Sequence, residues 1–310
     1  MGLVSGSAAC TRFNVISLPD NPEFELIPFR PIMPGSSIRE KEGFIPYEPG
    51  ESFEIGARCW AFRIRTDKVV LDGTAIAERV LELVKAETES VGPPSPKLRQ
   101  QLRLQAEEEM MQHPMPRSHI IECLMEETVL YVGSTAKGQL GMVLEMLKRI
   151  GVEVEFKTPW LDSGQEEELS ELVEIKEPGQ SILGAEFLKK LLNDPDTFVE
   201  ADKGSVKMVT GDGAKVGLAG PVLNEVDRLI DQGALVLSAK LMVEGFAFSF
   251  DAFSFRFSGL KLDNLKSRHW IERLETRMEK IKALWDWLDN KYQLLMLKQQ
   301  GEDPGSDLDE

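Results

Sequence analysis

The sequence has few cysteines and histidines and lacks any long apolar run. Its three cysteines, Cys10, Cys59 and Cys123, lie far apart and are odd in number, so they make neither a disulfide framework nor a CxxC metal pair. We expect them to pack as small hydrophobic side chains. No stretch of about 18 apolar residues could form a transmembrane helix.

Targeting signals are missing as well. The first ten residues have neither the cationic start nor the apolar middle of a signal peptide. Gly6 stands where a myristoylation signal requires Ser or Thr. We therefore expect a cytoplasmic protein with no membrane partner.

Basic residues are in the minority. The chain has 36 Lys and Arg against 52 Asp and Glu, which gives a formal net charge of -16. This balance argues against a protein that is basic over its whole surface, as many nucleic-acid binders are. It leaves room for a local basic surface, because 36 cations are enough to form one. With 310 residues and 42% hydrophobic content, the chain can bury a real core.

Hydrophobic periodicity predicts an α+β fold with antiparallel sheets, helices and a long C-terminal helix. One strand, within residues 56–71, places Arg63 and Arg65 on the same face. A hairpin turns at residues 211–213, and alternating residues over 234–262 predict a three-stranded meander. Helical spacing predicts helices over residues 72–91, 97–111, 137–151, 181–196 and 221–233.

We divide the chain into five consecutive parts. They are an N-terminal β-rich part (1–71), a helical α+β part (72–160), a second α+β part with the hairpin and meander (161–262), the long C-terminal helix (263–300) and an acidic tail (301–310) that we expect to be disordered.

The predicted helix over residues 267–299 carries an unbroken heptad seam. Its members are Ile271, Leu274, Met278, Ile281, Trp285, Leu288, Tyr292 and Leu295. Such a stripe is a large apolar patch that a soluble protein buries. The period does not identify what covers it, so packing on the meander of the same chain and packing against a second subunit both remain open. We favour the subunit contact.

One glycine-containing segment needs separate treatment. The stretch "GSTAKGQL", residues 133–140, has two glycines at the spacing of a phosphate-binding loop. That loop needs a Lys on the phosphates and a hydroxyl on the magnesium ion, but Gln139 and Leu140 stand in those places. The segment is interpreted as a turn from a strand to a helix.

The stretch "MQHPMPRSHI", residues 111–120, holds two of the three histidines. His113 and His119 have no HxxxH pattern or cysteine pair nearby, so we interpret them as polar loop residues. Arg117 follows Pro116, and we place it on a rigid loop. There its planar guanidinium suits a phosphate oxygen. The local sequence favours another role, a salt bridge to the acidic helix just before it.

The order of these motifs resembles the bacterial RdgC family of recombination-associated DNA-binding proteins. The resemblance is carried by "GFIP", "RTDKVVL", "PRSHI", "VLYVGSTAKGQLGMVLEMLKRIG", "ADKGSVK" and "GALVLSAKLMV". It extends from about Arg12 to Leu262. The C-terminal heptad helix lies outside it.

The resemblance implies a horseshoe-like subunit that pairs at both ends into a ring-shaped homodimer. Double-stranded DNA would pass through the ring without sequence preference, and bound protein would restrain RecA-type recombination. The protein would be nucleoid-associated, would need no cofactor and would not be an enzyme. A ring can be acidic outside while a few cations, doubled by symmetry, line its hole.

The resemblance also assigns DNA-binding residues. The family's cation in the Pro-Arg run falls on Arg117, and the cation in its Ala-x-Lys run falls on Lys203. His119 stands where we expect an aromatic residue, and Lys207 is a further cation near Lys203. The alternative function is a metal-dependent, nuclease-like enzyme whose scattered carboxylates the sequence alone cannot assemble.

Overall fold

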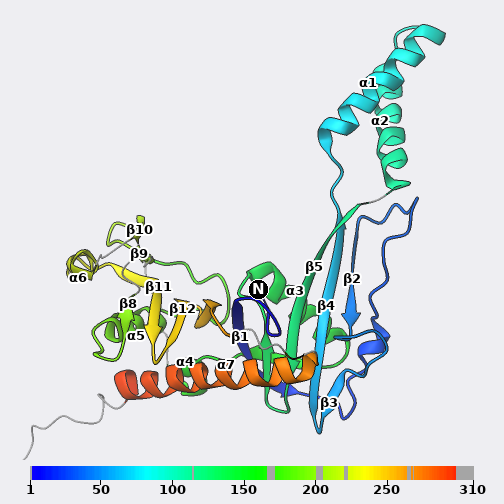
Figure 1. The fold of residues 1–310 in the computed structure, drawn as a ribbon. Helices are drawn as coiled ribbons and strands as arrows, with labels where there is room; N and C mark the ends of the chain where they lie inside the picture. Colours follow the sequence, from blue (N-terminus) through cyan, green and yellow to red (C-terminus); the bar gives the residue numbers. More distant parts are fainter. Residues whose placement is uncertain are drawn as a thin grey trace, which may run out of the picture. The chain divides into compact units, whose positions relative to one another are not determined.

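The computed structural model describes residues 2–113, 115–165, 172–199, 205–219, 223–263, 267 and 269–297 (Figure 1). Helices combine with antiparallel strands, so the predicted α+β class is confirmed. The chain divides into two compact units. Unit 1 comprises residues 1–22, 54–61 and 121–310, and unit 2 comprises residues 23–53 and 62–120. Each unit is built from separate pieces of chain, and the five-part division stays a prediction.

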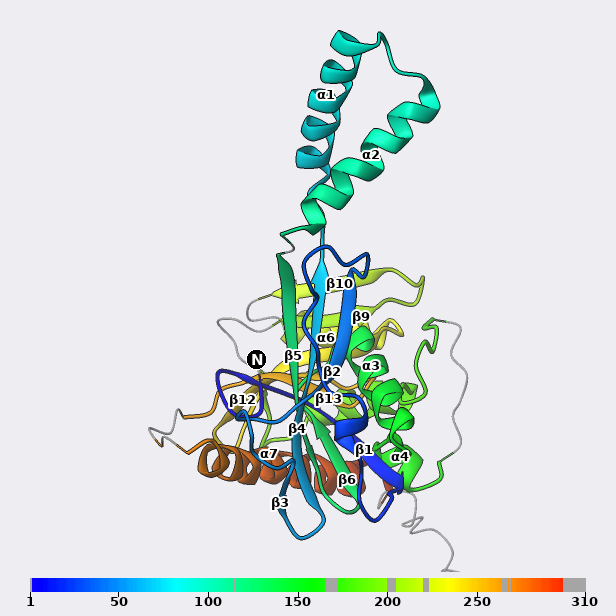
Figure 2. The ribbon, with the colours of Figure 1, turned by 90° about the vertical axis from the view of Figure 1, so that its right-hand side faces the viewer.

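Unit 2 combines strands with a helical hairpin. Its elements are the 3-10 helix Phe24–Leu26, β2 (Glu40–Ile45), α1 (Gly73–Ser90), α2 (Pro96–Met111), and the parts of β4 (Cys59–Val69) and β5 (Pro116–Met125) that fall within the unit. Strand β4 lies between β2 and β5. Helices α1 and α2 pair side by side as the hairpin between β4 and β5 (Figures 1 and 2).

The starts of both hairpin helices follow from local sequence. The Asp72 side chain accepts a hydrogen bond from the Thr74 amide and caps α1. The Ser95 side chain accepts one from the Leu98 amide and caps α2, where Pro96 occupies the first turn. The predicted helices over 72–91 and 97–111 are therefore confirmed, and each end agrees to within one residue.

Unit 1 contains most of the antiparallel strands. They are β1 (Ala8–Ser17), β3 (Glu54–Gly56), β6 (Val129–Val132), β7 (Glu153–Phe156), β8 (Phe198–Val199), β9 (Ser205–Val209), β10 (Lys215–Ala219), β11 (Leu235–Val243), β12 (Phe246–Asp251) and β13 (Arg256–Leu260). The predicted hairpin is β9 and β10, and the predicted meander is β11 to β13. Strand β1 joins the meander to β6 through pairing on both sides.

The helices of unit 1 are α3 (Lys137–Arg149), α4 (Pro159–Asp162), α5 (Ile182–Leu192), α6 (Leu223–Asp231) and α7 (Trp270–Tyr292). Helix α7 continues as a π-helical segment, Gln293–Leu297. The glycine-containing segment 133–140 is a turn from β6 into α3, as predicted.

Helix α7 packs on the meander of its own chain. The Trp285 ring lies 5.8 Å from the Phe255 ring and 4.8 Å from the Phe257 ring, and Tyr292 lies 5.2 Å from Phe187. Trp285 and Tyr292 are completely buried. The subunit contact that we favoured for the seam is therefore wrong. The phenylalanine-rich face of the meander would be a large exposed apolar surface, and the seam of α7 buries it.

Two smaller expectations concern cysteines and membrane helices. Cys10 and Cys123 are buried and Cys59 is half-buried. Burial raises the pKa of the Cys10 thiol to about 12, which keeps it protonated and unreactive. Over the described ranges, no helix combines the length and hydropathy needed to cross a bilayer.

Candidate nucleic-acid interface

Arg117 and His119 lie on a strand, which corrects their prediction as loop residues. Strand β5 begins at Pro116, at a position where the missing proline N–H removes little from the sheet. Because side chains alternate along a strand, Arg117 and His119 share one face of β5 and Ser118 lies on the other. Both Arg117 and His119 are exposed to solvent.

The two arginines of β4 are fixed by neighbouring groups. Arg63 donates hydrogen bonds to the carbonyl oxygens of Pro46 and Tyr47, at 2.7 and 2.8 Å from its Nη2. Arg65 makes a bidentate pair with Asp67, at 2.8 and 2.9 Å. These guanidiniums stabilise unit 2, and the Nε and Nη2 donors of both are engaged.

Ser118 on β5 also contacts the ion pair of Arg65 and Asp67. Ser118 donates a hydrogen bond of 2.7 Å to the Asp67 carboxylate, which is almost completely buried. Burial by itself would raise the pKa of Asp67. The hydrogen bonds from Arg65 and Ser118, with the charge of Arg65, outweigh burial and hold the pKa below its ordinary value. The carboxylate thus stays charged and ties β4 to β5 within unit 2.

Arg117 differs from the β4 arginines because it has no partner among the described residues. The salt bridge to the acidic helix, which the local sequence favours, is therefore wrong. Two glutamates of that helix, α2, bind other arginines. Glu107 pairs with Arg39 at 2.5 Å, and Glu109 pairs with Arg79 at 2.7 Å. The Arg117 guanidinium is left free to bind an external anion.

The remaining predicted cations belong to unit 1. Lys207 is exposed on β9 and makes no hydrogen bond or ion pair with any residue that the structure describes. Lys203 lies outside the described residues. Arg117 and Lys207 are thus both available cations, one in each unit.

A nuclease centre would need carboxylates gathered around a metal ion. Within the ranges that the structure describes, no three His, Cys, Asp or Glu side chains come close enough to hold one. The alternative function therefore gains no supporting geometry from this part of the chain.

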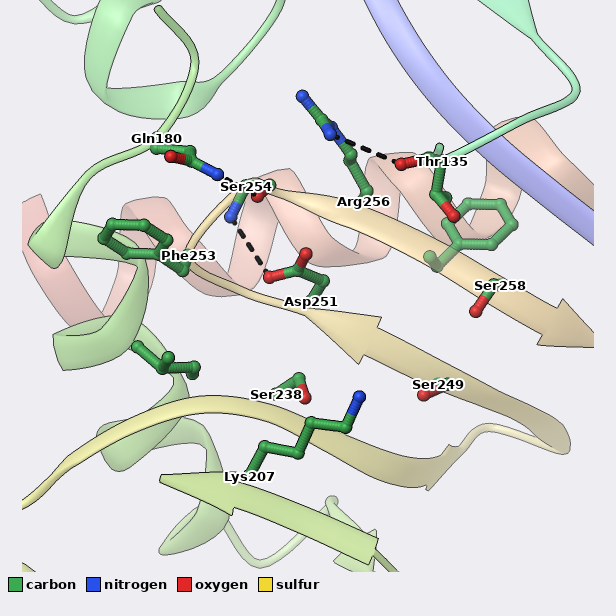
Figure 3. A pocket seen from close by; sticks show the side chains of 12 residues that line it. Thr135, Gln180, Lys207, Ser238, Ser249, Asp251, Phe253, Ser254, Arg256 and Ser258 are labelled. Carbon is green, nitrogen blue, oxygen red and sulfur yellow. Dashed lines mark hydrogen bonds between the residues drawn. The ribbon is translucent and has the colours of Figure 1, made fainter. Parts of the chain in front are cut away.

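The sequence interpretation missed a polar pocket on the meander. Lys207, Ser238, Asp251 and Arg256 contribute to its lining, and Figure 3 shows them beside one another. The alternation of the meander contained the signal, since Ser249 and Asp251 alternate with buried phenylalanines along β12. A polar sheet face gives no signal of a site by itself, because solvated sheet faces usually are polar.

Comparison with protein-family models and with curated proteins gave no match to this chain.

Proposed function

We propose that this protein binds double-stranded DNA without sequence preference, as a ring-shaped homodimer of horseshoe-like subunits that modulates RecA-type homologous recombination. The ring, its placement on the nucleoid and the recombination role rest on the resemblance to the RdgC family. The proposal needs neither a cofactor nor a catalytic centre, because phosphate contacts position a protein on DNA without specifying sequence.

The observation that carries DNA binding is the state of Arg117. It is exposed and unpartnered within the described residues, whereas Arg63 and Arg65 on the neighbouring strand are engaged. A planar guanidinium with all its donors free is well suited to a phosphate oxygen. Its position at the start of a paired strand limits the backbone entropy that binding would cost.

Lys207 and Lys203 would supply weaker contacts. Lysine binds phosphate as a point charge on a flexible stem, so each contact is less directional than that of an arginine. We expect Lys207→Ala to lower duplex affinity more mildly than Arg117→Ala. If the double variant Lys203→Ala with Lys207→Ala bound as tightly as the wild type, these residues would not lie on the DNA path.

The test that separates binding from cleavage uses relaxed and linear plasmid incubated with the protein and Mg²⁺. The proposed function predicts retardation of both DNA forms on a gel, weakening as salt rises, with no change in DNA length after the protein is removed. Cut plasmid would favour the nuclease alternative. Absence of retardation at low salt would contradict the proposal.

A further inference from the structure

The polar face of the meander carries a row of charged and hydroxyl side chains. Lys207 on β9 is opposite Ser238 on β11, Ser238 is opposite Asp251 on β12, and Asp251 is opposite Arg256 on β13. Four adjacent strands therefore contribute one residue each to a continuous line. The opposite face of the same strands holds the buried phenylalanines of the core.

This row borders a cavity of about 350 Å³. Other parts of unit 1 wall it: Thr135, Gln180, Phe253 and Ser254 come from the turns around the sheet (Figure 3). Ser249 and Ser258, which are paired with each other on β12 and β13, add two hydroxyls. The volume is that of a pocket for one small molecule.

Two opposite charges in this pocket lack direct partners. Over the described residues, the carboxylate of Asp251 has hydrogen bonds only from Ser254, whose amide is 3.3 Å from Oδ1. Lys207 has none. Arg256 makes no ion pair with Asp251, because its guanidinium donates hydrogen bonds to Glu177 and to the Thr135 carbonyl, the second of which Figure 3 shows. Burial raises the pKa of Asp251, and the charges of Arg256 and Lys207 offset this only in part. Poorly satisfied polar groups facing one cavity indicate a ligand that completes them.

The positions of the two charges constrain that ligand. Lys207 and Asp251 project from strands separated by β11, so their backbones are about 10 Å apart. A ligand that meets both needs an anionic group at one end and N–H donors at the other. A free α-amino acid is small for a cavity of about 350 Å³. A nucleotide carries its phosphate and the polar edge of its base at opposite ends.

We propose that the pocket binds a nucleoside monophosphate, with the phosphate on Lys207 and neighbouring serine hydroxyls and the base edge on Asp251. A carboxylate accepts hydrogen bonds from exocyclic amines of bases, and guanine offers a ring N–H beside its amine. Ser249 and Ser258 provide hydroxyls that both donate and accept. This site shares Lys207 with the proposed duplex contacts but not Arg117, so Asp251→Asn tests the pocket and Arg117→Ala tests duplex binding.

The test is isothermal titration calorimetry of the full chain with guanosine monophosphate. Inosine monophosphate, which lacks the exocyclic amine, and inorganic phosphate serve as comparison ligands. We expect saturable binding of the guanine nucleotide and weaker binding of both others. Asp251→Asn and Lys207→Met should each weaken it about tenfold or more, since each removes a charge-assisted hydrogen bond. Lys68→Ala, which removes an exposed cation of unit 2 that is paired with Glu40, is the control and should leave it unchanged.

Asp251→Asn preserves the side-chain shape, and circular dichroism checks that both variants are folded. Failure of the guanine nucleotide to bind the wild type would overturn the proposal, as would equal binding by wild type and folded Asp251→Asn. Binding of a 5′-phosphorylated oligonucleotide in the pocket without binding of the free nucleotide would also overturn it and would assign the Lys207 contact to DNA. Loss of duplex binding alone would leave this site intact and would contradict only the proposed function.

Discussion

The buried arginines of unit 1 and Arg117 at the start of β5 in unit 2 lie in contrasting surroundings. In unit 1, Arg12, Arg256 and Arg277 are buried, and each is held by groups of the chain. Arg12 makes two hydrogen bonds of 2.7 Å to Asp289 and lies 4.1 Å above the Trp285 ring. In unit 2, Arg117 is exposed and has no partner among the described residues.

The contrast distinguishes arginines that hold the fold together from an arginine that can bind a ligand. A buried guanidinium is costly unless groups of the chain bind it, so it acts mainly in the fold. An exposed, unpaired guanidinium contributes little to stability and can bind an anion at low cost. The comparison predicts that substituting a buried arginine of unit 1 lowers stability, and that substituting Arg117 lowers anion binding with little effect on stability.

The largest expected effect is removal of the helix that covers the unit 1 core. A chain ending at residue 263 lacks α7 and exposes the aromatic face formed by Phe255 and Phe257. We expect an insoluble or unfolded product, measured by recovery in the soluble fraction and by circular dichroism. A soluble, folded and smaller species would contradict packing of α7 on its own meander.

Trp285→Ala should have the next largest effect. Its ring is buried between Arg12 and the meander, so truncation should lower the free energy of unfolding by about 3–5 kcal/mol. Denaturant unfolding followed by circular dichroism measures the change. Trp287→Ala on the same helix is the matched control and should cost clearly less, because Trp287 is only half-buried. Equal losses would show that the seam is not the buried face.

In unit 2, Asp67→Asn should lower the free energy of unfolding by about 2 kcal/mol at neutral pH, since it leaves Arg65 without its carboxylate. The loss is smaller than for a fully buried pair because Arg65 is about one-third exposed. Ser118→Ala removes one hydrogen bond to the same carboxylate and should cost about 1 kcal/mol.

The same carboxylate gives unit 2 a pH dependence of known sign. The pKa of Asp67 is lower in the folded protein, so its stabilisation is present above the unfolded value of about 4 and is lost as pH falls through the folded pKa. The stability difference between wild type and Asp67→Asn should therefore shrink below about pH 4. If the stability difference between wild type and Asp67→Asn grew on acidification, the pKa of Asp67 would not be lowered in the folded protein.

Much of the fold was predictable because it follows from local patterns. Alternation located the meander, and the Gly211 to Gly213 segment located the hairpin between β9 and β10. The heptad period of α7 indicated that its seam is buried, but not which surface covers it. That surface was the chain's own meander, since only long-range contacts such as Trp285 with Phe257 decide the partner.

The candidate site was predictable only in part. The sequence singled out Arg117 but placed it on a loop and favoured a salt bridge to α2. It could not reveal that Glu107 is engaged by Arg39, which is distant along the chain. Predicting the pocket around Asp251 requires the pairing register of four strands, and no local motif encodes that register.

The most direct test of the proposed function is the salt dependence of duplex binding by wild type and Arg117→Ala, measured by fluorescence anisotropy on duplexes of different sequence. We expect Arg117→Ala to weaken binding by about the same factor on every duplex sequence. The slope of log affinity against log salt should fall by roughly one for each binding site removed, and the stability of the variant should be unchanged. Lys68→Ala, an exposed cation of unit 2 that is paired with Glu40, is the matched control and should leave the slope unchanged. An unaltered affinity and slope in a folded Arg117→Ala variant would contradict the assignment of Arg117 to the DNA interface.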